Sequence, residues 1–115
     1  MFNEINKTFG PRFEFNSDEL EFTNLDDYVG ANGNKPFIVK AVFVHTKKGE
    51  KYPCVVSEKE KIWLPAHLTG ICETIVSSPA MITAINEGHC QFEPVQYEKT
   101  GKYAGTYNTG TFVDI

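Results

Sequence analysis

Two runs of β-branched and aromatic residues on either side of a short polar segment form the strongest pattern along this chain. The runs are residues 37–46 and 52–57, and the lysine-rich segment between them contains Gly49. This arrangement predicts a β-hairpin with a short, solvated loop. Both alternating sets of side chains in residues 37–46 are mainly apolar. We therefore expect this strand to be covered on both faces or to curl between two regions of the core, as the long first strand of a small barrel does.

The residues before this hairpin predict a second, N-terminal hairpin. Residues 12–15 and 20–23 alternate between apolar and polar with the period of a strand, and residues 16–19 have turn composition. The apolar side chains, including Phe22, would face inward and the glutamates would face water. Residues 26–35 are rich in Gly and Asn and are expected to form a loop, which lacks the spacing of a phosphate-binding motif.

After the central hairpin, the pattern predicts a short third strand and then helical structure. The third strand covers residues 62–64. Apolar residues at helical spacing predict a helix over residues 68–76. A second helix is expected between Ser78 and Gly88, because serine is a good N-cap, the proline that follows fits the first helical position, and glycine commonly ends a helix.

Two further strands are predicted toward the C-terminal end. Residues 89–98 and 103–113 alternate with strand period around a turn at residues 98–102. Pro94 predicts a bulge or an edge position, because proline has no amide hydrogen for the ladder. The glycines of the last strand predict strong curvature.

The predicted order from residue 37 onward is strand, strand, strand, helix, strand, strand. This is the connectivity of the OB-fold, a five-stranded, partly open barrel. We therefore expect a mainly β single domain over residues 1–115. Residues 35–115 would form an OB-like barrel, and residues 1–34 an N-terminal hairpin extension and loop. The alternative is an open antiparallel sheet with helices on one face, an α+β sandwich.

Composition is typical of a folded globular protein, and we expect it to be cytoplasmic because the chain lacks the patterns of a membrane span and a signal peptide. A chain of 115 residues with 41% hydrophobic and 13% aromatic residues can bury one core. No apolar run approaches the roughly 18 residues needed to span a bilayer, and the first residues lack the layout of a signal peptide, so no membrane partner is expected. The three cysteines are an odd number without a C-x-x-C pair, which favours free, mostly buried thiols.

Charge is distributed unevenly along the chain. The net charge of −4 argues against coating nucleic acid by bulk electrostatics. Residues 1–34 hold two basic and seven acidic residues, whereas residues 35–64 hold seven lysines and three glutamates. The second segment therefore suggests a local anion-binding surface on an acidic protein. The alternative is a solvated hairpin whose lysines protect its edges from aggregation.

The predicted fold places lysines and aromatic residues at its binding loops. An OB-fold binds oligonucleotides and oligosaccharides on the face of its second and third strands, between the loop joining the first two strands and the loop joining the last two. These loops are residues 46–51 and 98–102, and both contain lysines. Single-stranded nucleic acid needs cations for its phosphates and aromatic faces for its bases. Alternatively, the rings fill the barrel. The candidate nucleic-acid-binding residues are Lys40, Lys47, Lys48, Lys51, Tyr52, Lys61, Trp63, Tyr97, Lys99, Lys102, Tyr103 and Tyr107.

Four short segments also resemble a group of small bacterial mobile-element proteins. They are residues 62–68 (Ile-Trp-Leu-Pro-Ala-His-Leu), 84–88 (Ala-Ile-Asn-Glu-Gly), 101–103 (Gly-Lys-Tyr) and 112–115 (Phe-Val-Asp-Ile). They are similar to small proteins encoded by phages, plasmids and conjugative elements of Gram-positive bacteria, some of which resemble OB-fold single-stranded DNA-binding proteins. The resemblance covers about residues 37–115. It implies a single-stranded DNA-binding accessory protein in DNA replication, recombination or transfer.

The remaining function classes have weaker support. The three histidines and three cysteines lack the paired spacing of zinc or catalytic sites, so we expect no enzyme activity, no cofactor and no metal. The main alternative function is a protein-binding module, an inhibitor or nucleic-acid mimic that docks on a basic host or phage protein. Self-association as a homodimer is a further expectation, because an OB-like barrel leaves an edge strand. The acidic residues of the alternative surface are Glu14, Glu19, Glu21, Asp26 and Asp27.

Overall fold

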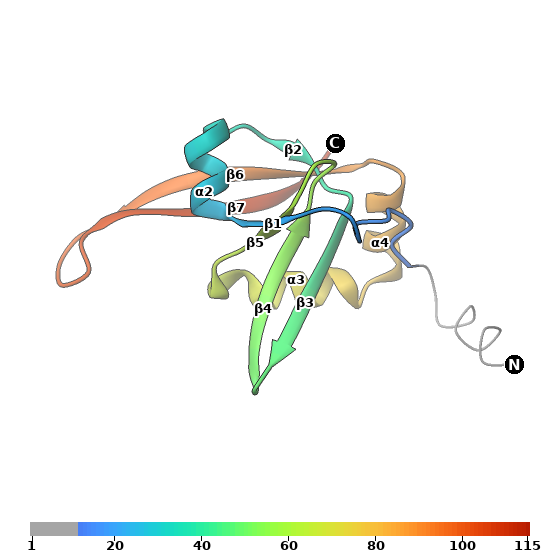
Figure 1. Ribbon diagram of the computed structural model, residues 1–115, viewed down its shortest axis with the longest axis horizontal. Coiled ribbons are helices and arrows are strands. Elements are labelled where there is room, and N and C mark those ends of the chain that lie inside the picture. Colours follow the sequence, from blue (N-terminus) through green and yellow to red (C-terminus); the bar gives the residue numbers. More distant parts are fainter. Residues whose placement is uncertain (1–11) are drawn as a thin grey trace, which may run out of the picture.

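The computed structural model describes residues 12–115, which form two β-sheets flanked by short helices (Figure 1). The part of the expected N-terminal extension before Arg12 lies outside the described residues. The strands are β1 (Phe22–Asn24), β2 (Phe37–Ile38), β3 (Ala41–Lys47), β4 (Glu50–Val56), β5 (Lys61–Trp63), β6 (Cys90–Lys99) and β7 (Gly105–Asp114). The helices are α2 (Leu25–Asn32), the 3-10 helix η1 (Ala66–Leu68), α3 (Thr69–Val76) and α4 (Pro79–Asn86). The strand orders are β1-β5-β4-β3 in one sheet and β2-β6-β7 in the other.

The expected long strand over residues 37–46 is divided between the two sheets. β2 pairs with β6, whereas β3 pairs with β4. The chain changes sheet at two adjacent residues. The amide of Val39, which is fully buried, donates to the carbonyl of Cys90 at 2.9 Å, and the amide of Lys40 donates to the carbonyl of Val56 at 2.8 Å. One segment therefore serves both sheets, as its two apolar faces predicted.

The predicted central hairpin is confirmed, and its turn is tight. Lys47 pairs with Glu50, so the connection consists of Lys48 and Gly49. Their φ angles are 52° and 80°. Positive φ at both positions is the geometry of a type I′ turn, whose twist matches that of the flanking strands.

The predicted N-terminal hairpin is wrong. Residues 12–21 form no strand, and β1 pairs in parallel with β5. The side chain of Asn86, at the end of α4, donates to the carbonyl of Arg12 at 2.7 Å and accepts from the amide of Glu14 at 3.0 Å. Phe13 packs against the core. The alternation in sequence therefore reflects an irregular segment held by one side chain and one apolar contact, not a pair of strands.

The expected loop at residues 26–35 is mostly the helix α2. The side chain of Asn24 caps this helix by accepting a hydrogen bond of 2.8 Å from the amide of Asp27. Leu25 and Val29, one turn apart, are buried. Gly33 ends the helix with a φ angle of 72°. The asparagine and glycine residues that predicted a loop thus provide the two ends of a short helix.

Both predicted helices after the third strand are present. η1 leads into α3, and the hydroxyl of Ser78 caps α4 by accepting from the amide of Met81 at 3.3 Å. Gly88 follows α4 with a φ angle of 81°. Among residues 12–115, no single helix is long and apolar enough to cross a membrane. The segments Ala66–Val76 and Pro79–Asn86 reach that length and apolarity only as a pair, with a bend of 93° between them.

Of the two alternatives expected at Pro94, a bulge or an edge position, the β6–β7 hairpin shows the edge position. Consecutive pairs join Cys90–Lys99 to Gly105–Asp114, and Pro94 pairs with Gly110 inside this ladder. β2 pairs with the other edge of β6 only as far as Phe92. Pro94 therefore occupies an edge position, where its missing amide hydrogen is tolerated.

The two sheets are not closed into a barrel, and the fold is a β-rich α+β arrangement. α2 contacts β1 and β5 of one sheet and β7 of the other, and α3 packs against β3 and β4. Figure 1 shows α2 lying beside the middle of the long β6–β7 ribbon. Both sheets and the three α-helices contribute to one core, which consists of Leu25, Val29, Val39, Val42, Val55, Ile62, Leu64, Cys72, Ile75, Ile85 and Phe92.

Two glycine substitutions are expected to change stability in opposite directions. A Cβ atom at Gly110 would overlap the ring of Phe92 and lie 2.8 Å from the carbonyl oxygen of Glu93. Gly110→Ala should therefore lower the free energy of unfolding by about 1–3 kcal/mol. Gly30→Ala is the matched control, because nothing lies within 4 Å of its added Cβ, and it should stabilise α2 by about 1 kcal/mol. Urea denaturation of both variants measures the difference, and a neutral Gly110→Ala would contradict the close contact.

Candidate nucleic-acid interface

Aromatic side chains gather on the face of the four-stranded sheet that points away from α3. Phe43 of β3 and Trp63 of β5 both pair with the same residue of β4, and His45 pairs with Tyr52, so all four point to one side. The ring of Phe22, from β1, stacks on Trp63 with centroids 4.9 Å apart and planes 8° apart. The other three rings lie 5.8–6.4 Å from Trp63. We call these five residues the aromatic face.

Part of the aromatic face is open to solvent. Phe22 is 51% exposed and Tyr52 is 41% exposed, while Trp63 and Phe43 are half-buried. Phe22 was expected inside a hairpin, so its exposure is a correction. Trp63 was expected to stack on bases, yet one side of its ring is stacked on Phe22. Trp63 therefore holds the neighbouring rings in place, and only the rest of its ring surface belongs to the open part of the aromatic face.

Lysine charges border the aromatic face unevenly. The Nζ atom of Lys61 lies 4.2 Å from the ring centroid of Phe22, a cation–π geometry. Lys47 and Lys48 are exposed at the tip of the β3–β4 hairpin. Lys51 does not belong to this surface, because its Nζ atom forms an ion pair of 2.7 Å with Glu73 of α3. Of the three lysines expected in this loop, two therefore remain near the face.

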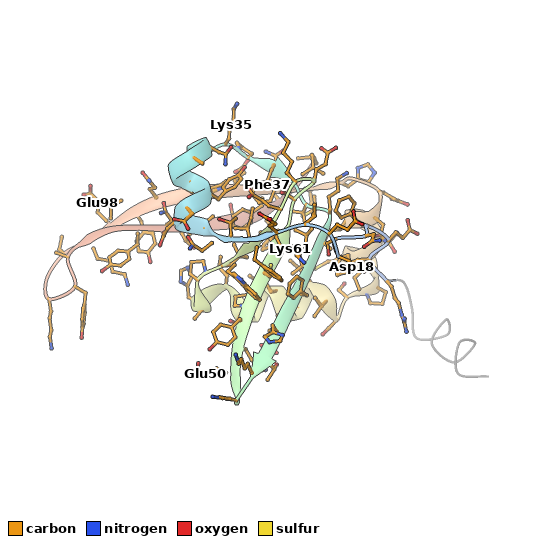
Figure 2. The ribbon with its side chains drawn as sticks, in the orientation of Figure 1. Asp18, Lys35, Phe37, Glu50, Lys61 and Glu98 are labelled. Atoms are coloured by element: carbon orange, nitrogen blue, oxygen red, sulfur yellow. The ribbon has the colours of Figure 1, made fainter. Side chains whose placement is uncertain are left out.

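Glu50 accepts a hydrogen bond of 2.6 Å from the hydroxyl of Tyr52 at the edge of the aromatic face. This bond stabilises the protonated phenol and raises the pKa of Tyr52 above its ordinary value. It also fixes the tilt of the ring. Figure 2 shows Glu50 at the tip of the β3–β4 hairpin, well away from Lys61.

A second group of aromatic residues lies on the β6–β7 ribbon. The rings of Tyr97 and Tyr107 stack with centroids 5.8 Å apart, and Lys99 places its Nζ atom 4.9 Å from Tyr107. Tyr103 is 69% exposed, and its carbonyl accepts a hydrogen bond of 2.8 Å from the hydroxyl of Tyr107. The Nζ atom of Lys102 lies 5.6 Å from the Tyr103 ring. We call residues 95–109, which extend away from the body in Figure 1, the arm.

The structure separates the two lysine loops and brings aromatic residues together between them. The tips of the β3–β4 hairpin and of the arm point in different directions (Figure 1). Near the base of both hairpins is a cavity of about 400 Å³, to which β5 contributes Trp63, β6 contributes Tyr97 and β7 contributes Tyr107. We call it the central cavity. Lys40 lies elsewhere, beside Phe15 in a separate hollow next to the end of α4.

Residues that were not candidates for nucleic-acid binding supply the polar wall of the central cavity. The side-chain amide of Asn108 donates to Asp26 Oδ1 at 2.8 Å, and His67 Nε2 lies 2.6 Å from the hydroxyl of Thr109. Asp26 was assigned to a loop and to the acidic surface of the alternative function, and Asn108 was assigned to the last strand without a role. The alternation of β3 could have identified Phe43 and His45, but no sequence pattern indicates the contact between α2 and β7.

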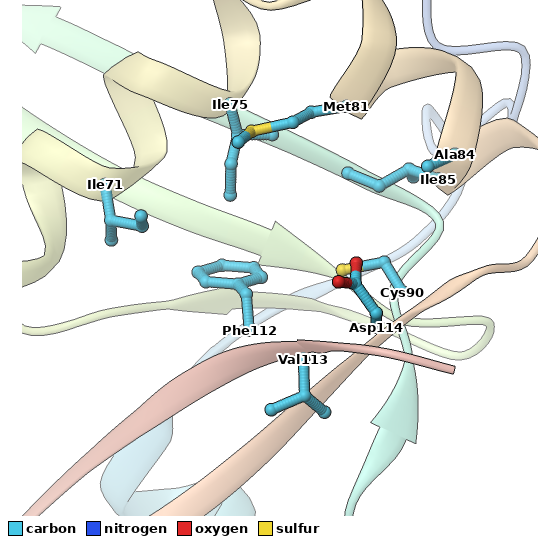
Figure 3. A pocket seen from close by; sticks show the side chains of 9 residues that line it. All are labelled: Ile71, Ile75, Met81, Ala84, Ile85, Cys90, Phe112, Val113 and Asp114. Carbon is cyan, nitrogen blue, oxygen red and sulfur yellow. The ribbon is translucent and has the colours of Figure 1, made fainter.

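A second cavity, of about 220 Å³, is apolar (Figure 3). It lies between α3, α4 and the body end of the β6–β7 ribbon. Figure 3 shows the ring of Phe112 between the helices and the ribbon, with Ile71 and Ile75 above it and the thiol of Cys90 close to the carboxylate of Asp114. Its lining has none of the candidate residues.

The three cysteines are free thiols, and two of them are fully buried, as expected. Burial raises the pKa of Cys54 and Cys72 to about 12 and the pKa of Cys90 to about 11. These thiols are therefore protonated near neutral pH, which makes them poor nucleophiles.

The raised thiol pKa values predict a loss of stability at alkaline pH. The folded protein holds these protons more tightly than the unfolded chain, whose thiols titrate near 9.0. The free energy of unfolding should therefore fall as pH rises above about 9. Urea denaturation under reducing conditions at about pH 8 and about pH 10.5 measures this decrease. Cys72→Ala should show a shallower decrease, and an identical decrease in both proteins would contradict the assignment to this thiol.

Comparison of the chain with protein-family models, with curated proteins and with solved structures finds no significant match. Function is therefore inferred from the aromatic face, the central cavity and the arm.

Proposed function

We propose that this protein binds single-stranded DNA along the aromatic face, across the central cavity and onto the arm. The observation that carries the proposal is the gathering of four aromatic side chains around Trp63, with the stacked pair Tyr97 and Tyr107 on the other side of one cavity. Aromatic rings beside cations are the usual platform for single strands, because every base has a face that stacks. Most of the strand would therefore bind without regard to its sequence.

The order of the β-strands along the chain also supports a binding site at the aromatic face. The chain forms a strand shared between two sheets, a hairpin partner, a third strand, a helical segment and a final hairpin, which is the OB-fold order. We propose an OB-fold derivative in which α2 lies where the barrel would otherwise close. Tyr52 and Trp63 of the aromatic face then lie on the second and third strands of that plan, the surface that OB-folds use for oligonucleotides.

Local charge makes binding compatible with a net charge of −4. Lys61 and Lys99 lie over rings on either side of the central cavity, and Lys47, Lys48 and Lys102 lie at the two tips. Few phosphate contacts give moderate affinity that weakens with salt. Together with the resemblance to mobile-element proteins, this supports an accessory role in DNA replication, recombination or transfer.

Fluorescence anisotropy of a labelled oligothymidine of about 30 nucleotides tests the proposal. Binding is expected at low salt and should weaken at physiological salt. A double variant, Lys61→Gln with Lys99→Gln, should reduce the slope of log affinity against log salt by about two. The matched control is the double variant Lys35→Gln with Lys40→Gln, which removes the same amount of charge. Lys35 (Figure 2) and Lys40 both lie away from the proposed site, so the slope should not change.

Tyr52→Ala tests stacking separately from charge. Its ring is 41% exposed, so its loss should leave folding intact while it removes a stacking surface. The affinity for oligothymidine should fall by roughly 5- to 150-fold, because a base stacked on an aromatic ring contributes about 1–3 kcal/mol. No binding by the unmodified protein at low salt would overturn the proposal and favour a protein partner docked on the acidic residues Glu14, Glu19 and Glu21.

A further inference from the structure

We infer that the central cavity holds one base of the bound strand and favours guanine there. This rests on the proposed function, and it adds base selectivity at one position to binding that is otherwise independent of sequence. The selective group is the carboxylate of Asp26.

The size and walls of the cavity suit a base. Its volume of about 400 Å³ lies in the range of roughly 300–1,000 Å³ found for small-molecule sites. Trp63 lines one side, and Tyr97 and Tyr107 line another. A strand that passes from the aromatic face to the arm must cross this opening, so a base turned inward would lie among aromatic side chains.

The carboxylate of Asp26 is exposed at this cavity and is held in one orientation. Its Oδ1 atom accepts the hydrogen bond from Asn108, which is the one recorded donor to this side chain within residues 12–115. Its neighbour Leu25 is buried, and this anchors the first turn of α2. The Oδ2 atom and the second lone pair of Oδ1 are therefore available to a ligand.

Asn108 holds the Asp26 carboxylate in place without neutralising its charge. The carbonyl oxygen Oδ1 of Asn108 is buried without a hydrogen-bond partner. Asp26 fixes the orientation of this amide, because a flipped amide would set its oxygen against the carboxylate. His67 and Thr109 are engaged with each other. Within residues 12–115, Asp26 is the one acidic residue in the lining of this cavity, which contains no lysine or arginine. The free lone pairs of its carboxylate are therefore the charged acceptors that a ligand in the cavity meets.

Guanine fits the exposed carboxylate of Asp26 better than the other bases. An ionised carboxylate only accepts hydrogen bonds, and its two oxygens can accept side by side. The Watson–Crick edge of guanine presents two adjacent donors, N1–H and the N2 amino group. Adenine and cytosine place a ring acceptor beside their amino group, and thymine places carbonyl oxygens on both sides of its single donor. These three bases would each set an acceptor against the carboxylate.

Asp26 has an effect on selectivity that is opposite to its effect on overall affinity. Its negative charge repels phosphates, so it lowers the affinity for every strand to a similar extent. Only a base that donates hydrogen bonds to the Asp26 carboxylate compensates for this loss of affinity. The ratio of affinities between two oligonucleotides therefore isolates the contribution of the cavity from that of the lysines.

The test compares oligonucleotides of about 12 nucleotides, all thymidine or with one central guanine, adenine or cytosine, by competition anisotropy at one salt concentration. The guanine oligonucleotide should bind about tenfold more tightly than the others, within the range for one good paired contact to a base. Asp26→Asn should reduce this preference to about twofold or less. Thermal unfolding confirms that the variants are folded.

Asp27→Asn is the matched control, because it removes the same charge from the same turn. Asp27 contacts Asn24 and does not line the cavity, so the guanine preference should remain. Equal affinity for all oligonucleotides, or a preference unchanged in Asp26→Asn, would overturn the inference while leaving single-stranded DNA binding intact. Failure of every oligonucleotide to bind would overturn the proposed function, and the inference with it.

Discussion

The crossing of the chain between the two sheets at Val39 and Lys40 is the constraint on which the rest of the structure depends. Two neighbouring amides bond to different sheets, so β2 and β3 diverge from one point. Val39 is fully buried there, in an interior that tolerates little change of volume. The aromatic face on one sheet and the arm on the other are therefore held at a fixed angle, and the central cavity is the space that this angle leaves.

α2 adds a carboxylate, that of Asp26, to the lining of the central cavity. Its buried residues Leu25 and Val29 attach it to the core, and its first turn carries Asp26 to the side chain of Asn108 on β7. The helix thereby places an acidic group beside rings that lysines flank. In the proposed complex, the phosphates follow Lys61 and Lys99 on the outside while the bases turn toward the rings. A protein with net negative charge can in this way bind an anion locally.

Sequence patterns predicted the elements whose signals are local. The central hairpin, the serine-capped helix after Ser78 and the two final strands follow from residues that are neighbours in the chain. α2 was missed because Gly33 and the asparagines predict a loop until the buried contacts of Leu25 are known. The candidate site was found in part: Trp63, Tyr97 and Tyr107 line the central cavity, and Tyr52 lies beside Trp63. Lys40 and Lys51 do not, because their positions depend on Phe15 and Glu73, which come from distant parts of the chain.

β6 is paired with a strand on each side only as far as Phe92, and the arm begins beyond that point. β2 pairs only as far as Phe92, so from Pro94 outward the ribbon has two strands. Such a ribbon is marginally stable in water, and its amide protons should exchange with solvent faster toward the tip than near Phe92. Single-stranded DNA stacked on Tyr97 and Tyr107 would order this ribbon, and the ribbon would lose conformational entropy as a result. In the proposed complex, fraying of the arm would lower the residence time of the bound DNA and let it dissociate in steps, from the tip toward the body.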